Sequence, residues 1–293
     1  MSGSAARPPS PALTIVAYSL GAAVRRRIFP IVLALTVAFL VLYGLAAHFA
    51  LSSADGFAGS DPDILDPVAF AGATIFGLAM FATLFLGAVL AIFLTLGIVR
   101  DDAASGLLQP IVVRPIGRAT MLGARFFGAA GVSAAYVAVV FMVALATTTA
   151  VGDWSPDHTL GPCLALMLAV TILAALSTLC SVFMSGTAQG IAVFMLFGAG
   201  LTGGLIGQIG DALNSETLEI IADISGWALP FDALYEAGLA GLISDTEGLA
   251  GVLLSLGPFG GSEAGSPLLV AWSIGYAALA LALAFAAFAR RDL

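Results

Sequence analysis

The sequence of 293 residues contains no lysine, and this absence excludes two classes of enzyme. A P-loop needs the Lys of its G-x-x-x-x-G-K-[ST] motif to reach the phosphates of a bound nucleotide. Schiff-base catalysis needs a Lys amine as its nucleophile. The chain itself therefore holds neither a P-loop ATPase site nor a Schiff-base site.

Cysteine and histidine are nearly absent, which excludes the usual disulfide and zinc frameworks. The two cysteines, Cys163 and Cys180, fall in one apolar run. If that run is a helix, they lie about 25 Å apart at about 1.5 Å per residue, too far to form a disulfide. The two histidines, His48 and His158, are too far apart in sequence for an H-E-x-x-H zinc motif. We interpret both cysteines as small buried apolar residues.

Charged residues are scarce, whereas apolar residues are abundant. Only 10% of the residues are charged and 60% are hydrophobic, while a soluble domain carries about 25% charged residues. Six runs contain no Asp, Glu or Arg and reach the length of about 20 residues that a transmembrane helix needs. These runs are 28–51, 68–99, 126–151, 160–183, 187–210 and 267–289. The composition predicts an all-α integral membrane protein with six transmembrane helices.

The arginines are all placed on one side of this plan. Four precede the first run, four lie between the second and third runs, and two follow the last. Because six spans put both termini on the same side, every Arg falls on one face, which the positive-inside rule makes cytoplasmic. An odd number of spans would scatter the arginines over both faces. We therefore expect a multi-pass protein of the cell (inner) membrane with both termini in the cytoplasm.

Three segments outside the runs have expectations of their own. Residues 1–11 are rich in Ser, Pro and Ala and are expected to form a disordered tail. Residues 12–27 repeat apolar residues at helical spacing, which predicts an interfacial amphipathic helix, with an extension of the first span as the alternative. Residues 211–266 are acidic and broken by Gly and Pro. We expect short external helices there, lying on the outer surface, rather than a folded globular domain.

The loop between the second and third runs has the most informative pattern. It begins with Arg100-Asp101-Asp102 and carries an apolar patch between its charges, formed by Leu107, Leu108, Ile111 and Val112. Pro110 and Pro115 would start, break or stop a helix. The pattern predicts a short amphipathic helix that ends in a rigid corner and faces the cytosol. A surface or re-entrant helix without a partner is the alternative.

This loop resembles the cytoplasmic loop of ABC-2 type transporter permeases. The resemblance rests on the acidic start, Gly106-Leu107-Leu108, Arg114-Pro115-Ile116-Gly117-Arg118 and Leu122-Gly123-Ala124-Arg125. The sequence departs from the family pattern at Leu107, where Thr is common, and at Ala124-Arg125, which replace Gly-Lys. The six-span plan, the interfacial N-terminal helix and the long outer segment add to the resemblance. It implies that residues 12–293 form a permease domain like that of a type V ABC exporter.

The resemblance also implies partners and a docking element. In such transporters the loop is a coupling helix that docks on a separate ATP-binding subunit, and two permeases work with two of these subunits. ATP and Mg would belong to that partner, so no cofactor is expected in this chain, and no nucleic acid is expected as a partner. The implied docking residues are Gly106, Leu107, Leu108, Arg114, Pro115, Ile116 and Arg118. As an alternative, the two arginines serve membrane topology and bind anionic lipid headgroups.

A run of small residues in the fifth span predicts close helix packing. Gly200 with Gly204, and Gly203 with Gly207, each form a G-x-x-x-G pattern. In the resembled family this span lines the dimer interface, so the resemblance implies that these glycines meet a second permease copy. Packing within one chain is the alternative.

Two further function classes were compared with transport. The six runs hold none of the Asp, Glu, Lys or Arg residues that ion-coupled transporters place inside the bundle, so energy for transport would have to come from a partner. An intramembrane hydrolase needs a Ser nucleophile near a His base, and neither His48 nor His158 has a matching Ser motif. A non-transporting scaffold would have no need of the charged loop. The sequence therefore favours the permease subunit of an exporter.

Overall fold

The computed structural model describes residues 28–55, 67–97, 118–152, 154–156, 158–243 and 266–290, and the regular secondary structure in these ranges is helical. The helices are α2 (Ile28–Asp55), α3 (Pro67–Thr95), α6 (Arg118–Gly152), α7 (Leu160–Phe183), α8 (Gly186–Leu213), α9 (Glu216–Ala228), α10 (Pro230–Ile243) and α12 (Pro267–Ala289). Six of them, α2, α3, α6, α7, α8 and α12, are long and apolar enough to cross a membrane. The chain is thus a helical, multi-pass membrane protein.

The predicted spans coincide with these six helices, and the differences lie at helix ends. Two spans, 160–183 and 267–289, match α7 and α12 to the residue. The second span was predicted to reach residue 99, but α3 ends at Thr95 and is followed by Gly97, which has a φ of 67°. The third was predicted to begin at residue 126, but α6 begins at Arg118. The left-handed conformation of Gly97 lies just past the end of α3, and α6 includes Arg118 and Arg125, which a criterion that admits no charged residue leaves out of a span.

The centre of the bundle is built around α3 and α7, whose apolar residues pack against α6. Phe76 of α3 and Phe141 of α6 are fully buried, with ring centroids 5.3 Å apart. Gly87 allows an especially close approach, because a Cβ at that position would stand 2.5 Å from Val137 and 2.9 Å from Val170. This packing fixes α3, α6 and α7 as one core.

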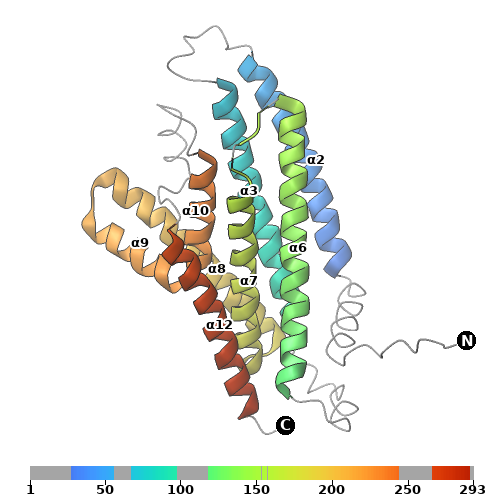
Figure 1. The fold of residues 1–293 in the computed structure, drawn as a ribbon, viewed down its shortest axis with the longest axis vertical. Coiled ribbons are helices and arrows are strands. Elements are labelled where there is room, and N and C mark those ends of the chain that lie inside the picture. The colour runs from blue at the N-terminus through green and yellow to red at the C-terminus, as the bar shows by residue number, and fades with distance from the viewer. Residues whose placement is uncertain are drawn as a thin grey trace, which may run out of the picture.

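Helix α2 lies at one edge of the bundle and α9 at the opposite edge (Figure 1). Polar pairs hold α2 to α6: Tyr43 hydrogen bonds to Thr148, and Thr36 lies 2.5 Å from the Tyr136 hydroxyl. The outward face of α2 is apolar and exposed, as expected of a helix that faces lipid.

The start of α6 and the end of α12 lie at the same end of the bundle. We call it the arginine end, because Arg118 and Arg125 belong to the first turns of α6 and Arg290 follows α12. The start of α6, the end of α7 and the end of α12 pack together through Leu122, Val182, Ala284 and Phe288. Figure 1 shows the C-terminus of α12 and the start of α6 at this end.

The segment between the fifth and sixth spans departs from its prediction. Two helices are present as expected, and α9 has no buried residue. Helix α10, however, does not lie on the outer surface, because Phe231, Leu234, Leu239 and Leu242 are buried in the core (Figure 1). Gly238 permits this packing, since a Cβ there would stand only 3.4 Å from the Cα of Pro162 in α7. The surface prediction was therefore wrong for α10.

The predicted tail (1–11), the interfacial helix (12–27) and most of the coupling loop lie outside the described residues.

Candidate functional site

Most of the predicted docking element falls in the part of the chain that the structure does not describe. Gly106, Leu107, Leu108, Arg114, Pro115 and Ile116 lie in residues 98–117. Arg118 is the first residue of α6. The structure does describe the two helix ends that flank the loop, Gly97 after α3 and Arg118 at the start of α6.

The end of α3 is held by a buried polar network that we call the Gln189 cluster, formed by Thr95, Gly97, Ser177 and Gln189. The side chain of Gln189, near the start of α8, is fully buried. Its Nε2 donates to the carbonyl oxygens of Thr95 (2.9 Å) and Ser177 (3.0 Å) and lies 2.8 Å from Ser177 Oγ. Its Oε1 accepts from the backbone N–H of Gly97 at 3.0 Å.

The Gln189 cluster thus joins three helices at the end of α3. The last carbonyl groups of α3 have no partner within the helix, and the amide of Gln189 donates to the Thr95 carbonyl and accepts from the N–H of Gly97, which follows the helix. The hydroxyls of Thr95 and Ser177 lie 2.7 Å apart and complete the network. Gly97 is the last described residue before the loop, so this network fixes the end of α3 from which the loop continues.

The predicted glycine face of α8 lies against α9 and α10 of the same chain. A Cβ at Gly200 would stand 2.6 Å from the ring of Phe231, and one at Gly203 would stand 2.7 Å from Ser225 Cβ. Gly207 faces Ala222 in the same way, at 3.0 Å. Packing within one chain therefore accounts for these contacts, and a contact between two permease copies remains a prediction.

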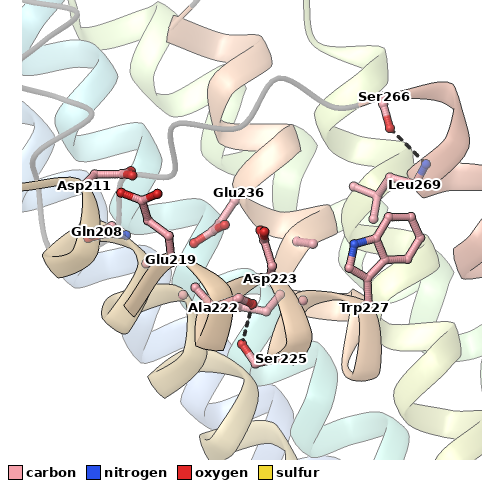
Figure 2. A pocket seen from close by; sticks show the side chains of 15 residues that line it. Gln208, Asp211, Glu219, Ala222, Asp223, Ser225, Trp227, Glu236, Ser266 and Leu269 are labelled. Carbon is pink, nitrogen blue, oxygen red and sulfur yellow. Dashed lines mark hydrogen bonds between the residues drawn. The ribbon is translucent and has the colours of Figure 1, made fainter. Parts of the chain in front are cut away.

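A cavity of about 320 Å³ opens where α8, α9, α10 and the start of α12 meet. Figure 2 shows Asp211 and Glu219 at one end of it, Glu236 and Asp223 in its middle, and Trp227 at the other end. Gly204 and Gly207 form part of its wall on α8, and these two positions place no side chain in the space. Its size lies at the lower end of the range for small-molecule pockets, about 300–1,000 Å³.

Asp232 is the most deeply placed carboxyl group of this cavity. Its side chain is 6% exposed, and its Oδ2 lies 2.5 Å from the point where a Cβ of Gly204 would stand. The Oε1 of Glu236 lies 2.6 Å from the same point, so the two carboxyl groups meet over one glycine. Burial, and then the charge of Glu236, raise the pKa of Asp232 to about 8, against a hydrogen bond from the Gly204 backbone that lowers it.

The electrostatics of the cavity are negative. Five carboxyl groups line it, from Asp211, Glu219, Asp223, Asp232 and Glu236. The sequence has no Arg or Lys between Arg125 and Arg290. Arg290 follows the last turn of α12, about 30 Å along that helix from the cavity-lining residues at its start. The cavity therefore disfavours anions and favours protons and cations.

Two tryptophans connect α9 to α12 beside the cavity. The indole N–H of Trp272 donates to the carbonyl oxygen of Trp227 at 3.0 Å, and the two rings meet edge to face at 5.8 Å. Helix α12 begins there with Ser266, whose hydroxyl accepts from the N–H of Leu269 at 3.1 Å. Within the described ranges, no three His, Cys, Asp or Glu side chains are placed to hold a metal ion.

The buried carboxyl groups were missed by the sequence reasoning. The six apolar runs contain no Asp, Glu or Arg, so these runs give no sign of a carboxyl group inside the bundle. Asp232 and Glu236 belong to α10, a helix between spans that packs into the bundle. The spacing of Phe231, Leu234 and Leu242 on one face of that helix was the available signal.

No family model matches the chain, and no curated protein matches it.

Proposed function

We propose that this chain is the membrane-spanning permease subunit of an ABC transporter of the ABC-2 type, which exports a substrate across the cytoplasmic membrane with ATP hydrolysed by a separate subunit. The observation that carries the proposal is the arginine-bounded loop between α3 and α6, with Gly106-Leu107-Leu108 followed by Arg114-Pro115-Ile116. The six apolar helices supply the membrane domain that this function needs.

The ends of the two helices that flank the loop support this proposal. The end of α3 is fixed by the Gln189 cluster, and α6 begins among packed helix ends at the arginine end. Helix α6 has 35 residues, about 52 Å, which exceeds a hydrocarbon core of about 30 Å. A partner bound to the loop would therefore act on the bundle through the two helices that the loop joins, α3 and the long helix α6.

The competing functions receive less support. His48 and His158 are both exposed, whereas an intramembrane hydrolase needs a His base next to a nucleophile in its interior. The absence of Lys leaves the chain without a P-loop of its own. Energy would therefore be supplied by a partner, and both termini would lie in the cytoplasm with the arginines.

Co-purification from membranes tests the proposal. The chain is expressed with each candidate ABC-type ATP-binding subunit from its own genome and is purified through a tag on the chain. We expect the two proteins to co-purify, and Leu108→Asp to reduce the recovered ATP-binding subunit by about tenfold or more, because it places a charge in an apolar contact. Ala104→Asp, which adds the same charge outside the docking residues, is the matched control. Undiminished recovery with Leu108→Asp would remove the docking assignment.

A further inference from the structure

Helix α8 links the two features described above. Near its first turn, Gln189 holds the end of α3, and about 22 Å further along the same helix Gly204 forms the wall of the acidic cavity. The residues that α8 buries follow one face between these points: Gly186, Gln189, Gly190, Val193, Phe197, Gly200, Gly203 and Gly210. One rigid helix thus runs from the loop-bearing end of the bundle to the cavity.

The Gln189 cluster differs in kind from the other contacts between α3 and α8. Those contacts are apolar, such as Leu96 against Gly190 and the ring of Phe85 against Phe197 at 6.2 Å. Apolar contacts are non-directional and do not specify which backbone groups of the two helices face each other. The amide of Gln189, by contrast, fixes a donor and an acceptor of the α3 backbone in a buried site, where an unmade hydrogen bond is costly.

We propose that Gln189 is a positioning residue that makes the ends of α3 and α7 and the start of α8 move as one unit, so that a displacement at the loop after Gly97 changes the cavity between α8, α9 and α10. This inference rests on the proposed function, because it assigns the path by which an ATP-binding subunit would act on the permease. Ser177 connects the same unit to α7, the buried centre of the bundle.

The geometry at the far end of α8 makes the cavity sensitive to such a movement. The glycine face allows no clearance, because a Cβ at Gly204 would already touch the carboxyl groups of Asp232 and Glu236. A shift of α8 along or about its axis would therefore change the distance between these carboxyl groups and the helix. Phe231, stacked on Phe197 at 5.8 Å, transmits the same shift to the start of α10.

Thiol labelling of the cavity tests this role in the complex of the full chain with its ATP-binding subunit. Cys163 and Cys180 are replaced by Ala, and the cavity-lining Ala233 is replaced by Cys as a reporter. The rate of maleimide labelling is measured without nucleotide and with ATP plus vanadate. With Gln189 intact, we expect ATP to change this rate by about fivefold or more, as for two coupled sites.

Three variants separate a positioning role from a general loss of packing. Gln189→Met keeps the volume but removes every hydrogen bond of the amide, and the ATP-dependent change in labelling should disappear while the complex still assembles and hydrolyses ATP. Gln189→Glu should retain the ATP-dependent change in labelling, because a buried carboxylic acid keeps its proton and offers one donor and one acceptor. Thr178→Val, the control, removes a buried hydroxyl that donates to the carbonyl oxygen of Ala174 in its own helix at 2.7 Å, and it should also retain the ATP-dependent change in labelling.

The outcomes are distinguishable. A response to ATP that persists unchanged in Gln189→Met, or that is lost equally in Thr178→Val, overturns the positioning role. If ATP changes nothing even with Gln189 intact, the proposed function fails and the positioning role fails with it. If Gln189→Met is not recovered from membranes, Ser177→Ala replaces it, because that variant removes only the hydroxyl from the cluster. The ATP-dependent change in the labelling rate of Ser177→Ala should lie between those of Gln189→Met and the unaltered chain. A change as large as that of the unaltered chain would again overturn the positioning role of Gln189.

Discussion

At the scale of single residues, Gly200 determines how closely α10 approaches α8. The ring of Phe231 occupies the space that a side chain at position 200 would need, and this ring is fully buried and stacked on Phe197. A fully buried aromatic ring cannot move aside without disturbing its neighbours. Gly200 is therefore a contact point between two helices.

A pair of matched substitutions on α8 tests this contact. Gly200→Ala is expected to lower the free energy of unfolding by about 1–3 kcal/mol, because the added methyl group overpacks the interface. Gly198→Ala is the control, because a Cβ there meets nothing within 4 Å, and it should be neutral or stabilise the protein by up to about 1 kcal/mol. Thermal unfolding of the two purified proteins in detergent measures the difference. Equal midpoints for both variants would contradict the close contact.

Asp232 gives the protein a pH dependence with a defined sign. Its pKa in the folded protein is about 8, raised first by burial and then by Glu236, whereas in the unfolded chain it returns to the ordinary value of 3.8. Between these values the folded protein holds a proton that the unfolded chain releases. The stability that the folded protein gains from protonated Asp232 is therefore fully present below about pH 3.8. It is lost as the pH rises toward about 8.

Asp232→Asn should remove this decline, because an amide cannot ionise. We expect the variant to lose less stability than the unaltered chain between about pH 5 and about pH 9, measured as the midpoint of thermal unfolding. Asp223→Asn serves as the control, since it removes one exposed charge from the same cavity and leaves Asp232 in place. The same slope with and without Asp232 would show that this carboxyl group is not buried as described.

The sequence could predict the small-residue contact at this scale but not its partner. The G-x-x-x-G spacing shows that a backbone can be approached closely, yet the same pattern fits a second copy or another helix of the chain. Gln189 was visible as a polar residue near a span end. Its role depends on Thr95 and Gly97, which are distant in sequence and become neighbours only when α3 and α8 pack.

At the scale of elements, the corner between α8 and α9 positions one wall of the cavity. Helix α8 ends at Leu213, and Asn214 follows in the left-handed conformation with φ 49° and ψ 47°. The N–H of Ser215 then donates to the carbonyl oxygen of Gly210 at 2.9 Å. Asn tolerates this conformation better than most residues with a side chain, and a β-branched residue tolerates it poorly.

Substitution of Asn214 should separate conformational strain from loss of the side chain. Asn214→Gly removes the side chain but suits the left-handed conformation, so it should be neutral or slightly stabilising. Asn214→Val should cost about 1–2 kcal/mol, because a β-branched residue is strained there. Thermal unfolding of both variants measures this difference, and a valine variant as stable as the glycine variant would contradict the assigned corner.

Helix α10 shows the limit of sequence reasoning about elements. The long apolar spans were predictable because only a helix of about 20 apolar residues satisfies its backbone in lipid. A helix of 14 residues with acidic side chains is too short to span. Hydropathy alone does not show whether it lies on a surface or packs into a bundle. Its burial is decided by small residues in two helices, such as Gly200 in α8 and Gly238 in α10 itself.

At the scale of the whole molecule, the proposed function places the two ends of the bundle on opposite sides of the membrane. Thr120, exposed near the start of α6, marks the arginine end, and Ser52, exposed near the end of α2, marks the other. In a background without Cys163 and Cys180, an impermeant maleimide added to intact cells should label Ser52→Cys. It should label Thr120→Cys only after the membrane is opened. Labelling of Thr120→Cys in intact cells would reverse the orientation.

We propose that the chain is a membrane gate driven by an ATP-binding subunit that it does not contain. ATP hydrolysis by that subunit is measured in lipid vesicles with the chain, without it, and with its Leu108→Asp variant. We expect a hydrolysis rate that changes several-fold when the unaltered chain is present and returns to the rate of the subunit alone with Leu108→Asp. A rate that is the same in all three preparations would contradict it.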